Sequence, residues 1–303
     1  MPHVPDFPRR VSVEVTNHCD QRCRLCPREA FTRPLGFMPR DLFAKIAAEC
    51  ARYDTVLWLH FLGEPLLHRE LPALVRDAKQ AGVGQVGLST NGVSLAGPMV
   101  DALLDSGLDR LECSMDANER DAYREMRGRD HFDRVVENVR AFLGRKRELG
   151  RQTPVTSVQF MRTATVEAGL DALVDEWRPH LGERDFVMTI VPATFGGAIA
   201  DGARAGSAER GVCAWLTTAL MVLQDGTVTM CGADWDAHHP LGNVATASLH
   251  ELWHGDEMTR RRAMHAAARF DQVGGCGGCE DWVLADGAGY ANALEEVDRR
   301  RAS

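Results

Sequence analysis

The chain has 303 residues, 45% of them hydrophobic, so it is long enough to form one large domain, or a domain with an appendage, around a buried core. It contains no run near the ~20 consecutive apolar residues that a membrane span needs, and residues 1–10 hold three prolines and no apolar signal-peptide core. Its 43 acidic and 35 basic residues give a formal charge of −8, which argues against broad binding of nucleic acid or anionic lipid. We therefore expect a cytoplasmic protein with a small-molecule substrate and no membrane or nucleic-acid partner.

Short β-branched or apolar runs alternate with helix-length segments through the first two thirds of the chain, which is typical of βα units around a parallel sheet. Six strands are predicted, at residues 11–16, 55–62, 86–90, 110–115, 155–160 and 186–191. Because two more strands do not follow, the predicted fold class is α/β, a partial (β/α)6 TIM-like barrel.

The composition changes to Gly, Ala and Ser between residues 195 and 210, which indicates a linker. Beyond it, two apolar runs flank Asp225-Gly226 within residues 220–230 and predict a β-hairpin, and residues 291–301 predict a terminal helix. We expect a barrel over residues 1–205, a small module of β-hairpin plus helix over 206–285, and a C-terminal helix within 286–303.

Nine cysteines are an odd number, and seven of them form two spaced sets, which suits metal ligation in a reducing compartment better than a disulfide framework. The first set, Cys19, Cys23 and Cys26, follows the first strand directly as C-x3-C-x2-C. Three thiolates this close can hold a cubane iron-sulfur cluster and leave one iron open. A zinc site that borrows His18 is the alternative on spacing alone.

Residues 11 to about 195 resemble the radical SAM superfamily. Thr16, Asn17 and the three cysteines match its cluster loop, and Gly63, Glu64 and Pro65 match its Gly-Gly-Glu-Pro turn, with Leu62 at the first glycine position. The resemblance implies that the open iron binds S-adenosylmethionine and that the turn contacts its methionine amino group. It implies further cofactor-facing residues at the ends of strands three and four, namely Ser89, Asn91, Ser114 and Asp116.

The second set, Cys213, Cys231, Cys276 and Cys279, ends in C-x2-C, and four such thiolates suit either zinc or a fully ligated [4Fe-4S] cluster. Residues 213–279 resemble the auxiliary-cluster extension of radical SAM enzymes in its short twitch form, a SPASM-related module with one auxiliary cluster. The resemblance thus implies S-adenosylmethionine and two [4Fe-4S] clusters as cofactors. An auxiliary cluster without an open iron would carry electrons, which suits an oxidation.

Three further side chains are candidate catalytic residues. Period-two alternation puts Glu14 on the face of Thr16 and His60 on the face of Glu64, so both are predicted to line the barrel. Arg162, at the end of strand five, can hold a polar substrate by bidentate hydrogen bonds. The alternatives are satisfied structural groups for Glu14 and His60 and a surface arginine for Arg162.

The cysteine pattern resembles the twitch subgroup of 2-deoxy-scyllo-inosamine dehydrogenases and related aminoglycoside-biosynthesis enzymes of antibiotic pathways. This implies an oxidoreductase that turns a secondary alcohol of an aminocyclitol or aminoglycoside-type carbohydrate into a ketone. A 5′-deoxyadenosyl radical would abstract the hydrogen atom, the auxiliary cluster would accept the second electron, and a flavodoxin- or ferredoxin-type protein would be the reductant.

Three alternatives remain open. A radical epimerase of the same subgroup needs a thiol to return a hydrogen atom, and we predict Cys50 and Cys113 to be core residues facing helices. Many peptide-modifying maturases carry an N-terminal recognition domain, for which the start of strand one near Val11 leaves no room. A non-catalytic metal-binding or electron-transfer protein would hold zinc in the second set.

Overall fold

The computed structural model describes residues 3–202, 209–285 and 289–302. They form two compact units, each treated by itself. The first unit comprises Met1–Cys19, Leu25–Val86 and Ala193–Ala288, and the second comprises Asp20–Arg24, Gly87–Pro192 and Gly289–Ser303. Within the described residues, no helix is long and apolar enough to cross a membrane.

All six predicted strands are present. Their bounds are β1 Arg10–Val13, β2 Val56–Trp58, β3 Gln85–Thr90, β4 Arg110–Asp116, β5 Val155–Met161 and β6 Phe186–Ile190. β1 pairs with β2, and β3, β4, β5 and β6 pair in succession, all in parallel. β1 and β2 end three to four residues earlier than predicted, because the chain leaves the ladder there to enter the cluster loop and the Gly63–Pro65 turn.

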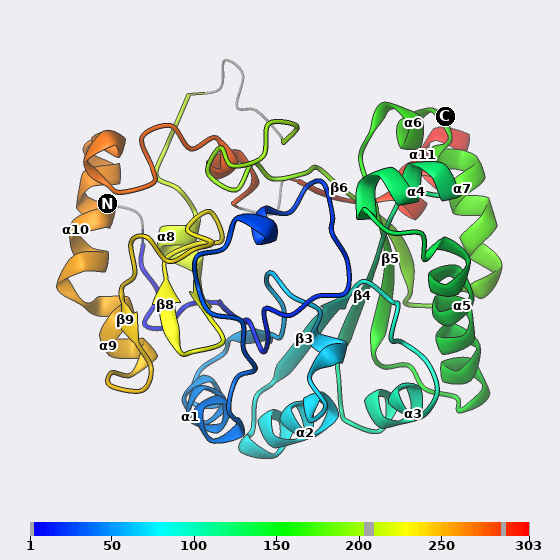
Figure 1. Ribbon diagram of the computed structural model, residues 1–303, viewed down its shortest axis with the longest axis horizontal. Coiled ribbons are helices and arrows are strands. Elements are labelled where there is room, and N and C mark those ends of the chain that lie inside the picture. The colour runs from blue at the N-terminus through cyan, green and yellow to red at the C-terminus, as the bar shows by residue number, and fades with distance from the viewer. Residues whose placement is uncertain (1–2, 203–208, 286–288, 303) are drawn as a thin grey trace. The chain divides into compact units, whose positions relative to one another are not determined.

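The second unit is built on β3–β6, and its helices are α3 Pro98–Leu104, α4 Arg120–Arg127, α5 Phe132–Glu148, α6 Ala164–Ala168, α7 Leu170–Trp177 and α11 Ala293–Ala302. α5 and α7 lie side by side, in green in Figure 1. Arg140 of α5 pairs with Glu176 of α7 and stacks on Trp177. Trp177 is fully buried and packs against Phe160 of β5. The buried residues of α7 recur at i, i+3, i+4 and i+7, which gives the helix an apolar face that packs on the parallel strands; they are Leu170, Leu173, Val174 and Trp177.

The C-terminal segment differs from the sequence prediction at its start. Tyr290–Asn292 form a strand, β10, that pairs antiparallel with β6, and the helix α11 begins only at Ala293. The Asn292 side-chain oxygen accepts the backbone N–H groups of Leu294 and Glu295, which caps the helix. The prediction of helix at residues 291 and 292 was wrong because nothing local signals the open edge of β6.

The first unit contains β1, β2 and the predicted hairpin, with helices α1 Arg40–Cys50, α2 Leu71–Ala81, α8 Trp215–Thr218, α9 Leu249–His254 and α10 Asp256–Ala266. Strands β7 Ala219–Val222 and β8 Thr227–Thr229 pair antiparallel around Gly226, which has a φ of 86°. The sequence signal for a hairpin is thus confirmed. A short strand, β9 Gly242–Asn243, adds to β8, and both appear in yellow in Figure 1.

The hairpin also extends the barrel strands, which the sequence did not indicate. β7 pairs in parallel with β1 over its full length, and all four of its residues are buried. Gly196 of the predicted linker, and Thr194 just before it, donate backbone hydrogen bonds of 2.8 and 2.6 Å to the buried carboxylate of Asp281. The predicted boundary at 205/206 falls on residues outside the described ranges, and the boundary at 285/286 coincides with the end of one of them.

Candidate functional site

The turn after β2 lies directly against the start of the cluster loop, within the first unit. The Glu64 N–H donates to the His18 carbonyl oxygen over 2.8 Å, and a Cβ at Gly63 would overlap the Thr16 carbonyl. Glu64 is buried, and its carboxylate caps the short 3-10 helix Pro65–Leu67 by accepting the Leu66 N–H at 3.0 Å. Glycine is therefore required at position 63 for this close approach.

Leu62, at the first glycine position of the turn motif, is 5% exposed. It belongs to a small apolar cluster with Phe61, Met221 and Leu223, and Cys26 packs against that cluster. The departure from glycine thus provides an apolar surface against the last cysteine of the first set.

The middle of the cluster loop, Asp20–Arg24, belongs to the second unit and is fastened to the end of α4. Backbone N–H groups of Arg22 and Arg24 donate to the carbonyl oxygens of Arg127 and Met126 over 3.1 and 2.9 Å. The Arg127 guanidinium lies 3.7 Å from Cys23 Sγ. A buried cation thus lies beside a candidate metal ligand.

Arg127 also holds the end of β4. Its Nε lies 2.9 Å from Asp116 Oδ2, and a second nitrogen donates to the Ser114 carbonyl oxygen. Asp116 has a φ of 65° at a β-bulge, and burial raises the pKa of its carboxyl while Arg127 opposes that shift. Its Oδ1 is buried and accepts no hydrogen bond within the described residues, so it can still accept one from a ligand.

The other predicted cofactor-facing residues have defined partners within the second unit. Ser89 Oγ donates to Glu112 over 2.8 Å, and the Asn91 amide donates to Asp20 over 2.6 Å. Ser114 Oγ accepts a 3.4 Å hydrogen bond from Gln159. Asn91 therefore helps to fix the cluster loop as well as ending β3.

Glu14 forms a buried ion pair with Arg33, a residue of the segment that follows Cys26. The two guanidinium nitrogens of Arg33 bind both carboxylate oxygens at 2.7 and 3.0 Å, and one of them also binds Gln224 at 2.8 Å. Arg33 Nε lies 3.8 Å from Asp236. Burial raises the pKa of Glu14, and Arg33 opposes the shift. With both oxygens engaged, Glu14 fits the structural alternative better than a catalytic base.

The other two candidate catalytic residues differ in charge: His60 is neutral, and Arg162 is a cation paired with carboxylates. Burial, reinforced by the charge of Arg10, lowers the pKa of His60 to about 4, so its imidazole is neutral at pH 7. Arg162 pairs with Glu167 and, at 3.2 Å, with Glu296 of α11. Two carboxylates already occupy its guanidinium, which reduces its capacity to hold an anionic substrate.

The four cysteines of the second set come together in the first unit. Burial, with the charges of neighbouring cysteines, raises the pKa of Cys213 to about 12 and that of Cys276 to about 11. It raises the pKa values of Cys231 and Cys279 too, and Cys213, Cys276 and Cys279 all act on Cys231. Cys231 and Cys276 are buried and Cys213 and Cys279 are half-buried. Thiols that raise one another's pKa values ionise together only with a bound cation, so the donor set fits zinc or an iron-sulfur cluster.

Arg210 was missed by the sequence analysis. Its guanidinium donates to the Cys276 carbonyl oxygen over 2.7 Å, stacks on Phe270 and lowers the pKa values of Cys213, Cys276 and Cys279. It thereby offsets part of the negative charge of the thiolates. A basic residue three positions before Cys213 was the only available signal. Arg127 was missed for a similar reason: the sequence around it indicates only that a helix ends at Gly128.

Replacing Gly128 with alanine is expected to displace the cluster loop from α4, because the new Cβ would overlap the Arg22 carbonyl. Gly82 is the matched control: like Gly128 it ends a helix in the left-handed region, with φ 101° and ψ 12° against 68° and 2°, but a Cβ there would meet only Ala51 Cβ, at 3.8 Å. Both variants carry the backbone strain of about 1 kcal/mol. Only Gly128→Ala should lower the iron content of the reconstituted protein; equal iron in both variants would contradict the role of this contact.

Comparisons with known proteins agree with these two regions. Residues 13–151 match the radical SAM superfamily, and residues 213–280 match SPASM, an iron-sulfur cluster-binding domain. The cofactor-modifying protein of tungsten-containing aldehyde ferredoxin oxidoreductase from Pyrococcus furiosus is 33% identical over 106 residues, 34% of this chain and 30% of that protein. GTP 3′,8-cyclase from Chlorobaculum tepidum is 35% identical over 128 residues, 41% and 38% of the two chains. The chain thus spans less than half the length of these curated relatives.

Two solved structures share the fold over most of the chain. BtrN in complex with AdoMet and 2-DOIA is 18% identical, with a TM-score of 0.63 over 90% of this chain and 93% of BtrN. Streptococcus suis SuiB bound to the precursor peptide SuiA is 15% identical, with a TM-score of 0.69 over 84% and 66%. These likenesses confirm the expected α/β fold, a partial barrel whose sheet is not closed, with a C-terminal module.

The matched domains imply S-adenosylmethionine and [4Fe-4S] clusters as cofactors, and the donor sets described above fit both groups. Residues 13–151 thus match the radical SAM superfamily within an open parallel α/β barrel, and residues 213–280, which follow, match an iron-sulfur cluster-binding SPASM domain.

Proposed function

We propose that the protein is a radical SAM dehydrogenase that oxidises a secondary alcohol of an aminocyclitol or aminoglycoside-type carbohydrate to a ketone. Cys19, Cys23 and Cys26 would hold the cluster that binds S-adenosylmethionine, and the second cysteine set would hold one auxiliary [4Fe-4S] cluster. A flavodoxin- or ferredoxin-type protein would supply the first electron. Other members of the twitch subgroup, in particular epimerases, have the same two cluster sites. Residues outside the two cysteine sets must therefore distinguish oxidation from epimerisation.

The observation that carries the proposal is the position of the two cysteines outside both sets. Cys50 closes α1 and Cys113 lies in β4, and both are 0% exposed. Burial raises the pKa of the Cys50 thiol far above its usual value. An epimerase must return a hydrogen atom to the substrate from a thiol that faces it, and the seven remaining cysteines are assigned to clusters. Among the residues that the structure describes, no cysteine outside the two sets is exposed, which supports loss of the second electron and ketone formation.

The chain's own residues would bind and orient the reactants. When bound, S-adenosylmethionine and its cluster supply a radical that abstracts hydrogen, and the auxiliary cluster supplies a place for the remaining electron. Asp116 Oδ1 is a free acceptor for a cofactor donor group, and the Gly63–Pro65 turn would meet the methionine amino group. His60, neutral at pH 7, has a lone pair that can accept the hydroxyl proton of the carbinol.

The similarity to BtrN over nearly the whole of both chains is consistent with a small-molecule substrate such as the one in that complex. SuiB, whose structure contains a precursor peptide, favours a peptide-modifying maturase as the second candidate. The two candidates differ in substrate class, so one assay separates them.

The test is anaerobic turnover in D2O with S-adenosylmethionine, a reductant and either a panel of aminocyclitols or a panel of peptides, beside the Cys19→Ala/Cys23→Ala/Cys26→Ala variant. We expect one 5′-deoxyadenosine for each ketone formed by the wild type, and neither product from the variant. Deuterium at carbon in an isomeric product would identify an epimerase. Turnover of peptides alone would identify a maturase. Either result would overturn the proposed oxidation.

A further inference from the structure

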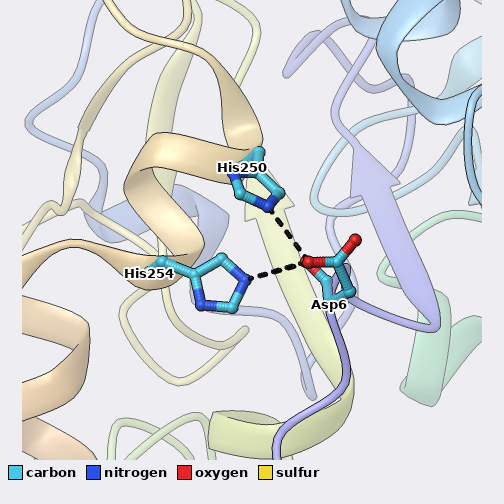
Figure 2. Close-up of side chains that lie close together, drawn as sticks. All are labelled: Asp6, His250 and His254. Carbon is cyan, nitrogen blue, oxygen red and sulfur yellow. Dashed lines mark hydrogen bonds and ion pairs between the residues drawn. The ribbon is translucent and has the colours of Figure 1, made fainter.

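Three metal-ligand side chains meet on the surface of the first unit, outside both cysteine sets. They are Asp6, in the segment before β1, and His250 and His254 of α9, and one donor atom of each lies within 4.8 Å of the others. Figure 2 shows both imidazole rings directed from α9 toward Asp6. His250 Nε2 lies 3.3 Å and His254 Nε2 lies 4.0 Å from Asp6 Oδ1.

The spacing of these atoms is close to that of a coordinated ion. Bonds of about 2.0–2.2 Å in a tetrahedral zinc site put neighbouring ligand atoms about 3.3–3.5 Å apart. The His250–Asp6 distance of 3.3 Å already meets this spacing. The His254–Asp6 distance of 4.0 Å is longer, and a small change of side-chain rotamer would shorten it. Histidines at i and i+4 face the same side of a helix, which is the spacing with which helical zinc sites supply two imidazoles.

The elements that present the ligands are held in place independently of any ion. The Trp253 indole N–H donates to the Pro5 carbonyl oxygen over 2.9 Å, which docks the segment before β1 onto α9. Glu49 of α1 accepts the backbone N–H groups of Leu249 and His250 at 2.8 and 2.7 Å, which fixes the start of α9. The ligands are therefore pre-organised, which lowers the entropic cost of binding an ion.

The side chains also have the right chemistry. Imidazole binds metal ions in its neutral form through either ring nitrogen. His254 Nε2 donates to the Asp6 carbonyl oxygen over 2.8 Å, so it carries a proton without an ion and must adopt the other neutral tautomer to bind one. Two imidazoles and one carboxylate suit zinc and similar divalent transition metals, and a fourth position is left for water.

We propose that Asp6, His250 and His254 form a zinc site that fastens the segment before β1 to α9 of the SPASM domain. The ion would cross-link the residues leading into the first barrel strand with the C-terminal domain through bonds stronger than the present hydrogen bonds. The site is independent of the proposed reaction, and it predicts one metal ion in addition to those held by cysteine.

The test uses the cluster-loaded protein, whose cysteines are occupied by iron and sulfide, dialysed anaerobically against zinc alone at micromolar concentrations. Zinc and iron are counted together, and the melting temperature is recorded with and without zinc. The variants are His250→Ala/His254→Ala and Asp6→Asn, the second of which keeps the size of the side chain. His131→Ala is the matched control, since His131 precedes α5 in the other unit and makes no side-chain cap bond.

We expect the wild type and His131→Ala to bind one zinc per chain without losing iron, and to melt at a higher temperature with zinc. His250→Ala/His254→Ala should bind zinc at least about 100-fold more weakly, a loss of about 2.7 kcal/mol, and show no thermal shift. Asp6→Asn should be intermediate. Zinc binding that is equal in all four proteins, or absent from the wild type, would overturn the site. Zinc that displaces iron would also overturn it, because the ion would then occupy cysteine.

Discussion

Replacing Cys276 and Cys279 together with alanine is expected to lower the iron content of anaerobically reconstituted protein from about eight to about four atoms per chain, because one of two [4Fe-4S] clusters is lost. Cys231 and Cys276 are buried, Cys213 and Cys279 are half-buried, and the four thiols act on one another's pKa values, so we treat them as one site. Removing half of the ligands leaves two thiols that cannot hold a cubane. Sulfide should fall in parallel, and the SAM-binding cluster should remain.

Cys50→Ala is the control for this measurement, because it removes a buried thiol that belongs to neither set. It should keep all eight irons. Four irons and one zinc in the wild type, with the zinc lost from the double variant, would identify the second set as a zinc site. That result would remove the electron acceptor and favour a redox-neutral reaction. Zinc that persists in the double variant would instead belong to Asp6, His250 and His254.

Replacing Arg33 with methionine is expected to destabilise the protein by about 3–5 kcal/mol, since removing one partner of a buried ion pair leaves an uncompensated charge. The Arg33 and Glu14 side chains are 7% and 0% exposed, so solvent does not screen the pair. The loss should appear as a lower melting temperature of the anaerobic protein. Its matched control is Glu14→Met/Arg33→Met, which removes both charges and should recover much of the loss.

The same variant has an expected pH dependence. Burial already raises the pKa of Glu14 above 4.5, and removing Arg33 removes its hydrogen bond and its charge, the two largest of the four influences that lower this pKa. A carboxyl whose pKa is raised in the folded state stabilises that state when protonated, and this stabilisation is lost as the pH rises through the folded pKa. The deficit of Arg33→Met should therefore be largest at neutral pH and shrink as the pH falls toward 4.5. A deficit that does not change with pH would show that Glu14 is not the uncompensated charge.

Local sequence patterns were sufficient for the elements whose formation depends on neighbouring residues. The six parallel strands follow from apolar runs spaced by helical segments, and the β7–β8 hairpin follows from Asp225-Gly226, whose glycine takes the positive φ that the turn requires. The burial of Cys50 and Cys113 was also predicted, because each lies on the apolar face of its element. The three cysteines and the Gly63–Pro65 turn pointed to the radical SAM domain for a related reason, since each motif is contiguous.

Long-range contacts decided the rest. β7 adds in parallel to β1, more than 200 residues away in sequence, and β10 closes against β6. Alternation placed Glu14 on the face of Thr16 but could not show which charge its carboxylate meets. Its partner Arg33 lies beyond the cluster loop, where no pattern indicates a buried ion pair. The sequence by itself determined the strands, the hairpin and the two cysteine sets, because backbone geometry and residue spacing are local properties. Only the tertiary structure decided which charges pair, placing Arg33 on Glu14, Arg127 beside Cys23 and Arg210 beside the second set, because a charge is stabilised by whichever opposite charge folding brings near it.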